Sequence, residues 1–326
     1  MAADDRRRGV LLLNLGGPGS LEEVRPFLYN LFSDREIIRL GPPPLQKPLA
    51  WLMAALRSRR TRKSYELIGG GSPLRRITEA QGRALEAELN GSWSVFIGMR
   101  YWRPYIWEAV QRALSRGVSS LVVMPLFPQY SRATTGSCFR EVRRALPEDG
   151  SGMDVAYVQG WHSHPGYIDA LVETVRQGLS RFTPEEREDV CLLFSAHALP
   201  QSLIDEGDPY VDQVMETARE VSAALNVGDW RVSFQSRSGP VRWTGPSTEE
   251  TLRALASEGC HSLLMVPVSF VSDHLETLYE MDILYRRLAE GLGLTFSRAP
   301  ALNTSPMLVK ALAEIVKEAA ERGGKD

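Results

Sequence analysis

The run Val190-Cys-Leu-Leu-Phe-Ser195 is short, apolar and not alternating. Such a run is expected of a strand buried on both faces, as in a parallel sheet. An amphipathic helical stretch follows at 212–225, then a strand-like run at 231–235 and a second helical stretch at 249–258. Strand and helix in alternation indicate right-handed βαβ units. The sequence therefore predicts an α/β protein with a parallel sheet.

The same plan appears twice along the chain. The third strand-like run of each half leads into a similar string, Met124-Pro-Leu-Phe-Pro128 or Val266-Pro-Val-Ser-Phe270. We therefore expect an internal duplication: two similar Rossmann-like domains, each a four-stranded parallel sheet flanked by helices. The expected strands are 10–15, 94–99, 120–126 and 154–159 in the first half, and 190–195, 231–235, 262–268 and 295–299 in the second.

The domain boundaries are predicted from this plan. We place the first domain at 8–172 and the second at 173–305, and we expect the helical stretch 306–326 to pack back on the first domain. The first domain carries an insert near 25–71, in which an apolar helical stretch leads into a basic run over residues 45–63. Three interpretations of that segment remain open: a helix packed on the sheet with a solvated charged end, a peripheral membrane contact, or the roof of a pocket for an apolar ligand that bears carboxylates.

Composition limits the class of protein. The 326 residues suffice for two ordinary domains, and apolar content of 43% with charged content of 24% is typical of a globular protein. The net charge of −2 predicts no attraction to nucleic acid. We find no membrane-spanning run and no signal-peptide pattern, and the three cysteines have no Cys-x-x-Cys spacing. These features predict a cytoplasmic protein, and the sequence does not indicate its oligomeric state.

Two polar strings follow buried runs of the second half. Ser195-Ala-His197 ends the first predicted strand, and Asp273-His-Leu-Glu276 follows the third. The carboxyl ends of parallel strands form the ligand-binding edge of such sheets, so we expect one site here. An imidazole among carboxylates suits a divalent ion such as Fe²⁺, or proton transfer near neutral pH. Plainer interpretations remain open: His197 as a capping or satisfied core histidine, and Asp273 with Glu276 as a capping box.

A further carboxylate extends this pattern. On a helix, Asp273, Glu276 and Glu280 fall on one face at i, i+3 and i+7. Like charges at this spacing repel one another, so helix capping alone does not explain the three carboxylates. Glycine-rich strings elsewhere do not indicate a nucleotide site. Asn14-Leu-Gly-Gly-Pro-Gly19 has Glu22 where the dinucleotide pattern needs its third glycine, and Ile68-Gly-Gly-Gly-Ser-Pro73 is not followed by Lys and Ser or Thr.

The chain resembles the ferrochelatases, which insert Fe²⁺ into a porphyrin in the last stages of haem synthesis. No single motif decides the resemblance, but the ordered set is specific and covers nearly the whole chain. The matching strings are Leu13-Asn-Leu-Gly-Gly-Pro18, Tyr65-Glu-Leu-Ile-Gly-Gly-Gly-Ser-Pro73, Gly98-Met-Arg-Tyr101, Pro128-Gln-Tyr-Ser131, Thr134-Thr-Gly-Ser137, Ser195-Ala-His-Ala-Leu-Pro200, Gly207-Asp-Pro-Tyr210, Phe234-Gln-Ser-Arg237, Gly239-Pro240 with Trp243, and Asp273-His-Leu-Glu-Thr-Leu-Tyr-Glu280.

The resemblance implies roles for these residues. His197 is similar to the family's active-site histidine and Glu276 to its carboxylate partner, both catalytic and both at the metal. His274, Glu280 and Asp273 are expected to support them in acid–base chemistry. Leu284 stands where the family often has another polar group, so the carboxylate row is short. The residues expected to bind porphyrin are Leu15, Arg60, Tyr65, Ser72, Arg100, Tyr130 and Trp243.

The resemblance also implies the reaction. A lyase would insert Fe²⁺, its metal substrate, into protoporphyrin IX with release of two protons to give protoheme. Leu15 favours protoporphyrin, because family members acting on coproporphyrin III often carry tyrosine near there. No iron–sulfur cluster is expected from three scattered cysteines. Alternatives are a coproporphyrin III ferrochelatase, a cobalt or sirohydrochlorin chelatase, and a non-catalytic haem or porphyrin carrier. The expected location is the cytoplasm, with residues 45–63 as a candidate contact to the inner face of the membrane.

Overall fold

The computed structural model describes residues 7–35, 38, 40–147, 152–237 and 241–323. Gly239 and Pro240, which belong to one of the family strings, lie outside these residues. The chain divides into two compact units. Unit 1 comprises the described parts of 1–127, 131–160 and 309–326, and unit 2 those of 128–130 and 161–308.

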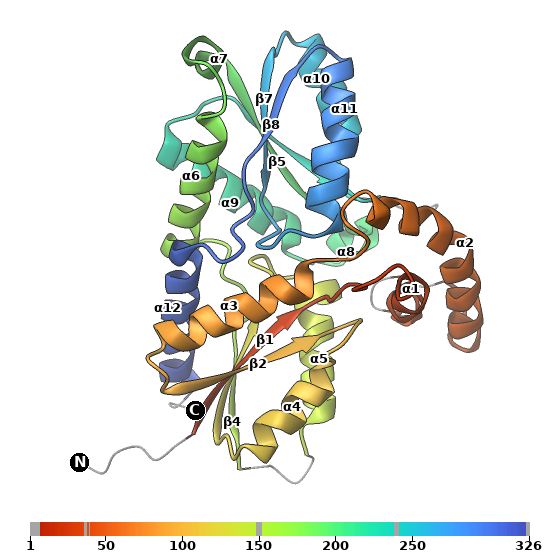
Figure 1. Ribbon diagram of the computed structural model, residues 1–326, viewed down its shortest axis with the longest axis vertical. Coiled ribbons are helices and arrows are strands. Elements are labelled where there is room, and N and C mark those ends of the chain that lie inside the picture. The colour runs from red at the N-terminus through yellow and green to blue at the C-terminus, as the bar shows by residue number, and fades with distance from the viewer. Residues whose placement is uncertain (1–6, 36–37, 39, 148–151, 238–240, 324–326) are drawn as a thin grey trace. The chain divides into compact units, whose positions relative to one another are not determined.

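Unit 1 is built on a four-stranded parallel sheet with the order β2-β1-β3-β4. Helices α4 and α5 cover one face of this sheet, and α3 lies on the other (Figure 1). The strands are β1 (Arg8–Asn14), β2 (Trp93–Met99), β3 (Ser120–Pro125) and β4 (Asp154–Tyr157), and the helices are α3 (Leu74–Glu88), α4 (Ile106–Ser115) and α5 (Ser137–Ala145).

Unit 2 repeats this plan with the order β6-β5-β7-β8, again all parallel. Helices α6 and α9 lie on one face of the sheet and α10 and α11 on the other (Figure 1). The predicted duplicated α/β fold is therefore confirmed. The strands are β5 (Val190–His197), β6 (Trp230–Gln235), β7 (Ser262–Pro267) and β8 (Thr295–Arg298), and the helices are α6 (Pro165–Leu179), α9 (Tyr210–Leu225), α10 (Thr248–Ser257) and α11 (Arg286–Gly291).

The two units also repeat local detail. In each sheet the second strand along the chain carries, at or next to its last residue, an isolated parallel bridge to the residue before the next helix: Met99 to Tyr105 and Phe234 to Ser247. The third strand of each sheet is followed by a π-helical segment, η2 (Arg132–Gly136) or η3 (Glu276–Tyr285). The structure also has the short helices η1 (Pro43–Leu45), α7 (Pro184–Glu188) and α8 (Gln201–Asp205), and the longer α12 (Pro306–Gly323).

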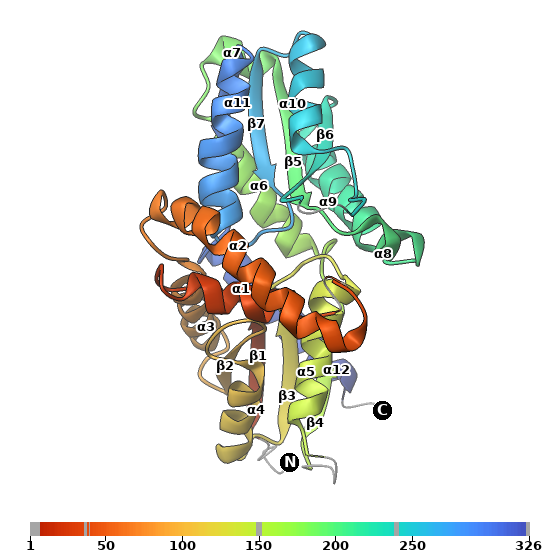
Figure 2. The ribbon, with the colours of Figure 1, turned by 90° about the vertical axis from the view of Figure 1, so that its right-hand side faces the viewer.

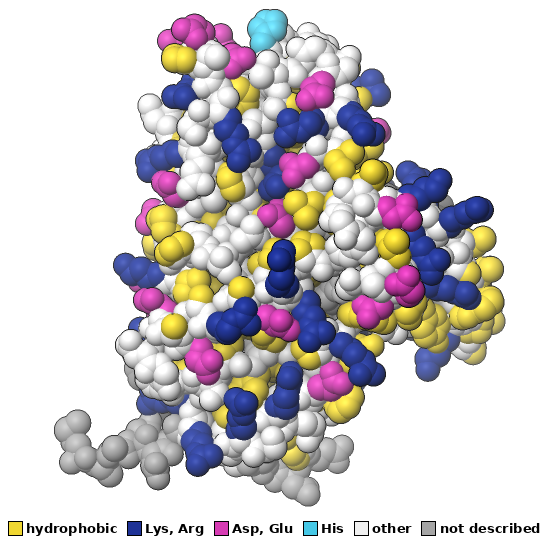
Figure 3. Space-filling model, viewed as in Figure 1, with side chains coloured by type: hydrophobic (Ala, Val, Ile, Leu, Met, Phe, Trp, Pro, Cys, Tyr) yellow, Lys and Arg dark blue, Asp and Glu magenta, His cyan; other side chains and the backbone are white. Residues whose placement is uncertain are grey.

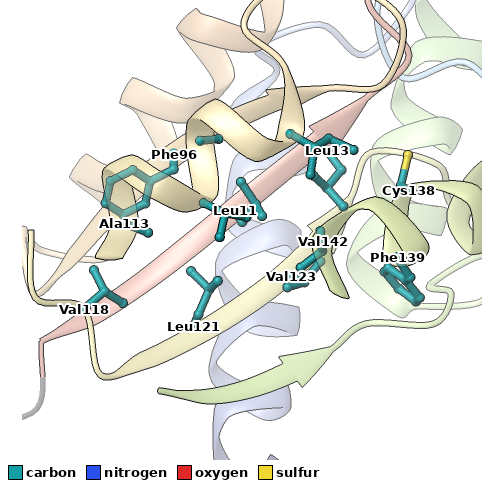
Figure 4. Packing of buried hydrophobic residues seen from close by; sticks show 13 residues of the cluster. Leu11, Leu13, Phe96, Ala113, Val118, Leu121, Val123, Cys138, Phe139 and Val142 are labelled. Atoms are coloured by element: carbon teal, nitrogen blue, oxygen red, sulfur yellow. The ribbon is translucent and has the colours of Figure 1, made fainter. Parts of the chain in front are cut away.

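Each unit has its own hydrophobic core. In unit 1, β1 and β3 pack against α4 and α5 through fully buried side chains such as Leu11, Leu121 and Val142 (Figure 4). In unit 2, Leu263 of β7 packs against α10 and against Met281 of η3. Burial of large aliphatic side chains contributes about 1.5–3 kcal/mol each, so both sheets are fixed independently of the polar groups at their edges.

The insert of unit 1 forms two packed helices, α1 (Val24–Ser33) and α2 (Gln46–Glu66) (Figures 1 and 2). The small residues Ala50 and Ala54 of α2 are buried, whereas Trp51 and Leu56 are 57% and 72% exposed. Apolar and basic side chains gather on the outer surface of this segment (Figure 3). The described part of the chain has no helix that is both long and apolar enough to cross a bilayer.

Candidate active site

His197 lies where the core of unit 2 ends. All the preceding residues of β5 are buried, and the side chain of His197 is 39% exposed at the carboxyl end of the strand. Its register partner on β6 is Gln235, and the β7 partner of Ser195 is Pro267, the last residue of that strand. The parallel register therefore brings the ends of three strands to one edge, as expected for a doubly wound sheet.

The His197 ring contacts a carboxylate directly. Its Nδ1 lies 2.8 Å from Oε2 of Glu276, the first residue of η3. The second oxygen of Glu276 lies 3.6 Å from Nε2 of His274, and Nδ1 of His274 donates to the carbonyl of Ser272 at 2.9 Å. When Glu276 is ionised it can only accept, so the proton of neutral His197 is on Nδ1 and Nε2 presents a lone pair. That nitrogen can take a proton or bind a metal.

The π-helical form of η3 determines which carboxylates face this edge. Hydrogen bonds from i to i+5 widen the turn, and such segments are frequent at functional sites. Oε2 of Glu280 accepts a hydrogen bond from Nε2 of Gln235 at 2.9 Å, and the same amide donates to the backbone carbonyl of Glu276 at 3.1 Å. The Gln235 side chain is oriented in turn by Ser195, whose hydroxyl donates to its Oε1 at 2.7 Å.

Ser236 connects the two carboxylates. Its Oγ lies 2.8 Å from Oε2 of Glu276 and 2.5 Å from Oε2 of Glu280. A hydroxyl has one proton to donate, so both contacts are satisfied when Glu280 is protonated and donates to Oγ while Oγ donates to Glu276. Ser236 has φ of +65°, in the left-handed region that few residues other than glycine adopt. This backbone conformation accompanies the position of its hydroxyl between the two acids.

The pKa values of Glu276, His197 and Glu280 are shifted in different directions by their surroundings. Burial opposes ionisation of Glu276, but the attraction of His197 and hydrogen bonds from both histidines outweigh it and hold the Glu276 pKa below its usual range. Burial likewise opposes charge on His197, yet Glu276 and, more weakly, Glu280 raise the His197 pKa. Burial and repulsion from Glu276 raise the pKa of Glu280 to about 7. The edge therefore holds one ionised carboxylate, a carboxyl group able to exchange a proton near neutral pH, and an imidazole whose protonated form is favoured.

Asp273 is placed apart from this pair. Its carboxylate accepts from Thr277 Oγ1 and Asn303 Nδ2, at 2.9 and 2.8 Å, and lies 3.3 Å from Nη2 of Arg298. The capping-box interpretation does not hold, because the backbone N–H of Asp273 donates to Asn303 and the Glu276 carboxylate turns to His197. The structure thus brings together His197, Glu276, His274 and Glu280, and places Asp273 in a separate polar cluster.

Three of the expected porphyrin-binding residues lie near one another in unit 1. Leu15 is half-buried directly after β1, and the backbone N–H of Ser72 donates to the carbonyl of Pro18 at 2.7 Å. Gly17 allows this approach, because a Cβ there would lie 2.7 Å from the Ser72 side chain and 3.9 Å from the Tyr65 hydroxyl. The loop after β1, the end of α2 and the loop before α3 therefore meet.

Arg100 and Arg60 occupy different environments. Arg100, directly after β2, pairs with Asp34 at 2.7 Å and donates to Ser137 Oγ at 2.8 Å, with 17% of its side chain exposed. It also lines a hollow of about 340 Å³, together with Lys47 of α2 and other side chains. Arg60 is exposed on α2. Arg100 thus has a protein partner for its charge, while Arg60 faces solvent.

The other two expected porphyrin-binding residues belong to unit 2. Trp243 forms an antiparallel bridge with Pro200, in the loop that follows His197. Its buried Nε1 has no hydrogen-bond partner within the described residues. The backbone N–H of Tyr130 donates to Gln213 of α9 at 2.7 Å. The described residues hold no group of three or more His, Cys, Asp or Glu side chains arranged to bind a metal ion.

Three residues that orient the acids had no role assigned from the sequence. Ser195, Gln235 and Ser236 stand inside the family strings, but the strings do not show which of them contacts a carboxylate. A usable signal was present. Gln235 ends the strand beside the one that carries His197 and Ser236 follows it directly, and polar residues at neighbouring strand ends are expected to meet.

Comparison with known proteins agrees with this geometry. The family model described as Ferrochelatase matches residues 7–320. The chain belongs to the ferrochelatase family. Curated ferrochelatases from Geotalea uraniireducens and Geobacter metallireducens are 50% and 49% identical to it, over 95% and 96% of this chain and 97% and 98% of theirs. The ferrochelatase of Gloeothece citriformis is a longer chain. It is 48% identical over 95% of this chain and 82% of its own length.

Solved structures show the same architecture at low sequence identity. The sirohydrochlorin chelatase SirB from Bacillus subtilis subspecies spizizenii, in complex with cobalt, aligns over 98% of both chains with a TM-score of 0.56 and 13% identity. SirB from Bacillus subtilis with Fe³⁺ aligns over the same shares with a TM-score of 0.58 and 14% identity. At such identity the likeness concerns the fold, so the ferrochelatase assignment rests on the family match.

Proposed function

We propose that this ferrochelatase-family chain is a lyase that inserts Fe²⁺ into protoporphyrin IX and releases two protons to give protoheme, in haem biosynthesis. Fe²⁺ is a substrate of this reaction. The observation that carries the proposal is the 2.8 Å contact between His197 Nδ1 and Glu276 Oε2. It fixes the imidazole so that Nε2 is directed away from its partner with a lone pair available. Family membership supplies the substrate class.

The titratable side chains of the site suit a reaction in which two pyrrole protons are exchanged for one divalent ion. Neutral His197 accepts a proton at Nε2, and ionised Glu276 stabilises the imidazolium that forms. Glu280, with its pKa raised to about 7, takes or passes a second proton through the Ser236 hydroxyl that lies between the carboxylates. His197 and Glu276 are also the side chains we propose at the metal, with His274 and Glu280 in support.

The porphyrin is proposed to bind through residues that the family strings carry. Leu15 and Ser72 supply half-buried apolar and hydroxyl groups beside the buried Tyr65, and Trp243 supplies a ring whose N–H has no partner among the described residues. Arginine is suited to hold the propionates, because its guanidinium pairs with carboxylates in a bidentate manner. The remaining proposed contacts are Arg60, Arg100 and Tyr130.

The assignment of His197 is tested by following zinc or ferrous insertion through porphyrin fluorescence. We expect His197→Ala to lower kcat by about 10²-fold or more, the usual contribution of a positioned acid–base group. His261→Ala, at an exposed histidine before β7, is the matched control. Near-normal turnover by a folded His197→Ala variant would refute the assignment. A chain that binds haem tightly but inserts no metal would be a carrier instead.

The same assay discriminates between porphyrins. We propose a preference for protoporphyrin IX, because the apolar Leu15 side chain offers no partner for an additional carboxylate. The expected kcat/KM is higher for protoporphyrin IX than for coproporphyrin III, and Leu15→Tyr is expected to narrow the difference. A higher kcat/KM with coproporphyrin III in the unaltered chain would identify that porphyrin as the substrate.

We also propose that helix α2 docks on an anionic membrane surface, as part of a cytoplasmic protein held at the inner face of the membrane. Leu45 of η1 and Trp51, Leu52 and Leu56 of α2 are each about half or more exposed, and a basic run follows on α2. Apolar side chains beside cations are the signature of an interfacial helix. The double variant Trp51→Ser/Leu56→Ser should lose sedimentation with phosphatidylglycerol vesicles. Trp107→Ser, at an exposed tryptophan of α4, should retain it.

The proposal includes no iron–sulfur cluster. Four cysteine thiolates hold such a cluster in most proteins, and the sequence contains three cysteines, at positions 138, 191 and 260. Iron and acid-labile sulfide analysis of the protein purified without oxygen checks this point. Stoichiometric sulfide would contradict it.

A further inference from the structure

Two cysteines of unit 2 lie together at the start of its sheet. Cys191 is the second residue of β5, and its register partner on β7 is Leu263. Cys260 lies in the short connection between α10 and β7, three positions before Leu263. Both cysteines contact the same hydrophobic cluster, so they lie on the same face of the sheet. The Cys191 thiol has both the Cys260 sulfur and the Asp229 carboxylate as hydrogen-bond partners within reach.

The two sulfur atoms differ in exposure. Cys191 is 6% exposed, whereas Cys260 is only partly buried. Cys191 Sγ lies 3.7 Å from Oδ2 of Asp229, and Cys260 Sγ donates to the carbonyl of Ser262 at 3.4 Å. An oxidant from solvent therefore reaches Cys260 first, with the buried thiol behind it.

The more exposed thiol, Cys260, is also the more acidic of the two. The hydrogen bond from Cys191 lowers the pKa of Cys260, against the effect of burial. The same hydrogen bond, burial and the nearby Asp229 carboxylate raise the pKa of Cys191. A thiolate is the reactive form of cysteine, and a partly exposed cysteine of lowered pKa beside a second thiol is the usual arrangement of a redox-sensitive pair.

We propose that Cys260 and Cys191 form a peroxide-oxidisable dithiol, in which Cys260 attacks the oxidant and Cys191 resolves the product to an intramolecular disulfide. The site lies at the amino end of β5, the opposite end of the strand from His197. The disulfide would link the start of β5 to the connection before β7, the strand that pairs with β5 from Ser262 onward. Such a bond would restrict the unfolded chain.

The oxidation is balanced with hydrogen peroxide as the two-electron oxidant. The Cys260 thiolate attacks one peroxide oxygen, the O–O bond breaks, and sulfenic acid forms while the leaving hydroxide takes a proton to become water. The Cys191 sulfur then attacks the sulfenic sulfur, the S–O bond breaks, and a second water leaves with the thiol proton. Two thiols and one peroxide give one disulfide and two waters.

The test uses the full chain, reduced and then exposed to hydrogen peroxide. Free thiols titrated in denaturant should fall from three per chain to one. Trypsin without reductant should release peptide 188–219 joined to peptide 254–286, at the sum of their masses less two hydrogen atoms. Cys138 is the internal control, because it is fully buried with its pKa raised to about 12, and peptide 133–140 should stay reduced.

Variants separate the two roles. Cys191→Ser should leave Cys260 as a sulfenic acid that dimedone traps, whereas Cys260→Ser should leave Cys191 reduced at the same peroxide dose. Both variants should retain metal insertion, since neither cysteine belongs to the proposed site, and that activity reports folding. Three remaining thiols, a disulfide between two chains, or oxidation of Cys191 in Cys260→Ser at the parent rate would each overturn the proposal.

Discussion

Glu280 is the residue whose protonation depends most on its surroundings. Its pKa is raised to about 7 from an ordinary 4.5, by burial and by repulsion from Glu276, while Gln235, Ser236 and the charge of His197 oppose the rise. Between these two pH values the folded chain holds more protons than the unfolded chain. The contribution of Glu280 to the free energy of unfolding therefore falls as the pH rises from 4.5 to 7, and above pH 7 it falls no further.

The corresponding prediction is that Glu280→Gln gains stability only at the higher pH. The amide keeps the shape of the protonated acid and removes the ionisation. We expect the variant to match the parent near pH 4.5 and to exceed it by roughly 2–3 kcal/mol at pH 8. Urea unfolding at both pH values measures the difference. Glu88→Gln, at an exposed carboxylate of α3, controls for the loss of one charge, and a difference that does not change with pH would contradict the prediction.

The residues of the site were predictable to different extents. His197 could be placed because it ends a buried run, and Glu276 and Glu280 because carboxylates rarely repeat along one helix face without reason. Asp273 shared the spacing but lies with Arg298 and Asn303, since it precedes the helix rather than belonging to it. Sequence spacing assumes a regular helix, and it cannot report where that helix begins.

At the scale of elements, the strands were predictable and the form of η3 was not. Buried parallel strands are continuous apolar runs, so their pattern is local. A π-helix depends on tertiary contacts. In η3, Asp282 pairs with Arg298 of β8, and Glu280 is held by Gln235 of β6. These partners are distant in sequence, and a single sequence does not reveal them.

The Arg298 cluster should therefore be a major support of η3. Nε and Nη2 of Arg298 contact the two oxygens of Asp282 at 2.7 and 2.8 Å, and only 10% of the Arg298 side chain is exposed. Arg298→Leu leaves two carboxylates without their cation and should cost about 3–5 kcal/mol in the free energy of unfolding. Denaturant unfolding measures the loss.

A double-mutant cycle shows whether the pair is the cause. Arg298→Leu/Asp282→Leu should be less destabilised than the sum of the single variants, because neither charge is left alone. Arg287→Leu, at an exposed arginine of α11, should change stability by less than about 0.5 kcal/mol. Additive single effects would show that Arg298 acts through packing rather than through Asp282.

At the scale of the molecule, the duplication could be predicted because each half repeats its order of buried runs, and each sheet has the same strand order. The two cores are separate: Leu11 belongs to the core of unit 1 and Leu263 to that of unit 2, and both are fully buried. Truncation of a buried leucine to alanine costs about 2–5 kcal/mol. Because the two residues share no core cluster, their effects should remain within their own units.

Hydrogen exchange read by mass spectrometry tests this expectation peptide by peptide. Leu11→Ala should speed exchange in β1, β2 and β3 and leave β5 and β7 close to the parent rates, whereas Leu263→Ala should do the reverse. The chain passes between the units after residues 127, 130, 160 and 308, so covalent connection alone could couple them. If either variant speeds exchange equally in both sheets, the two cores unfold as one cooperative unit and the duplicated plan describes architecture but not stability.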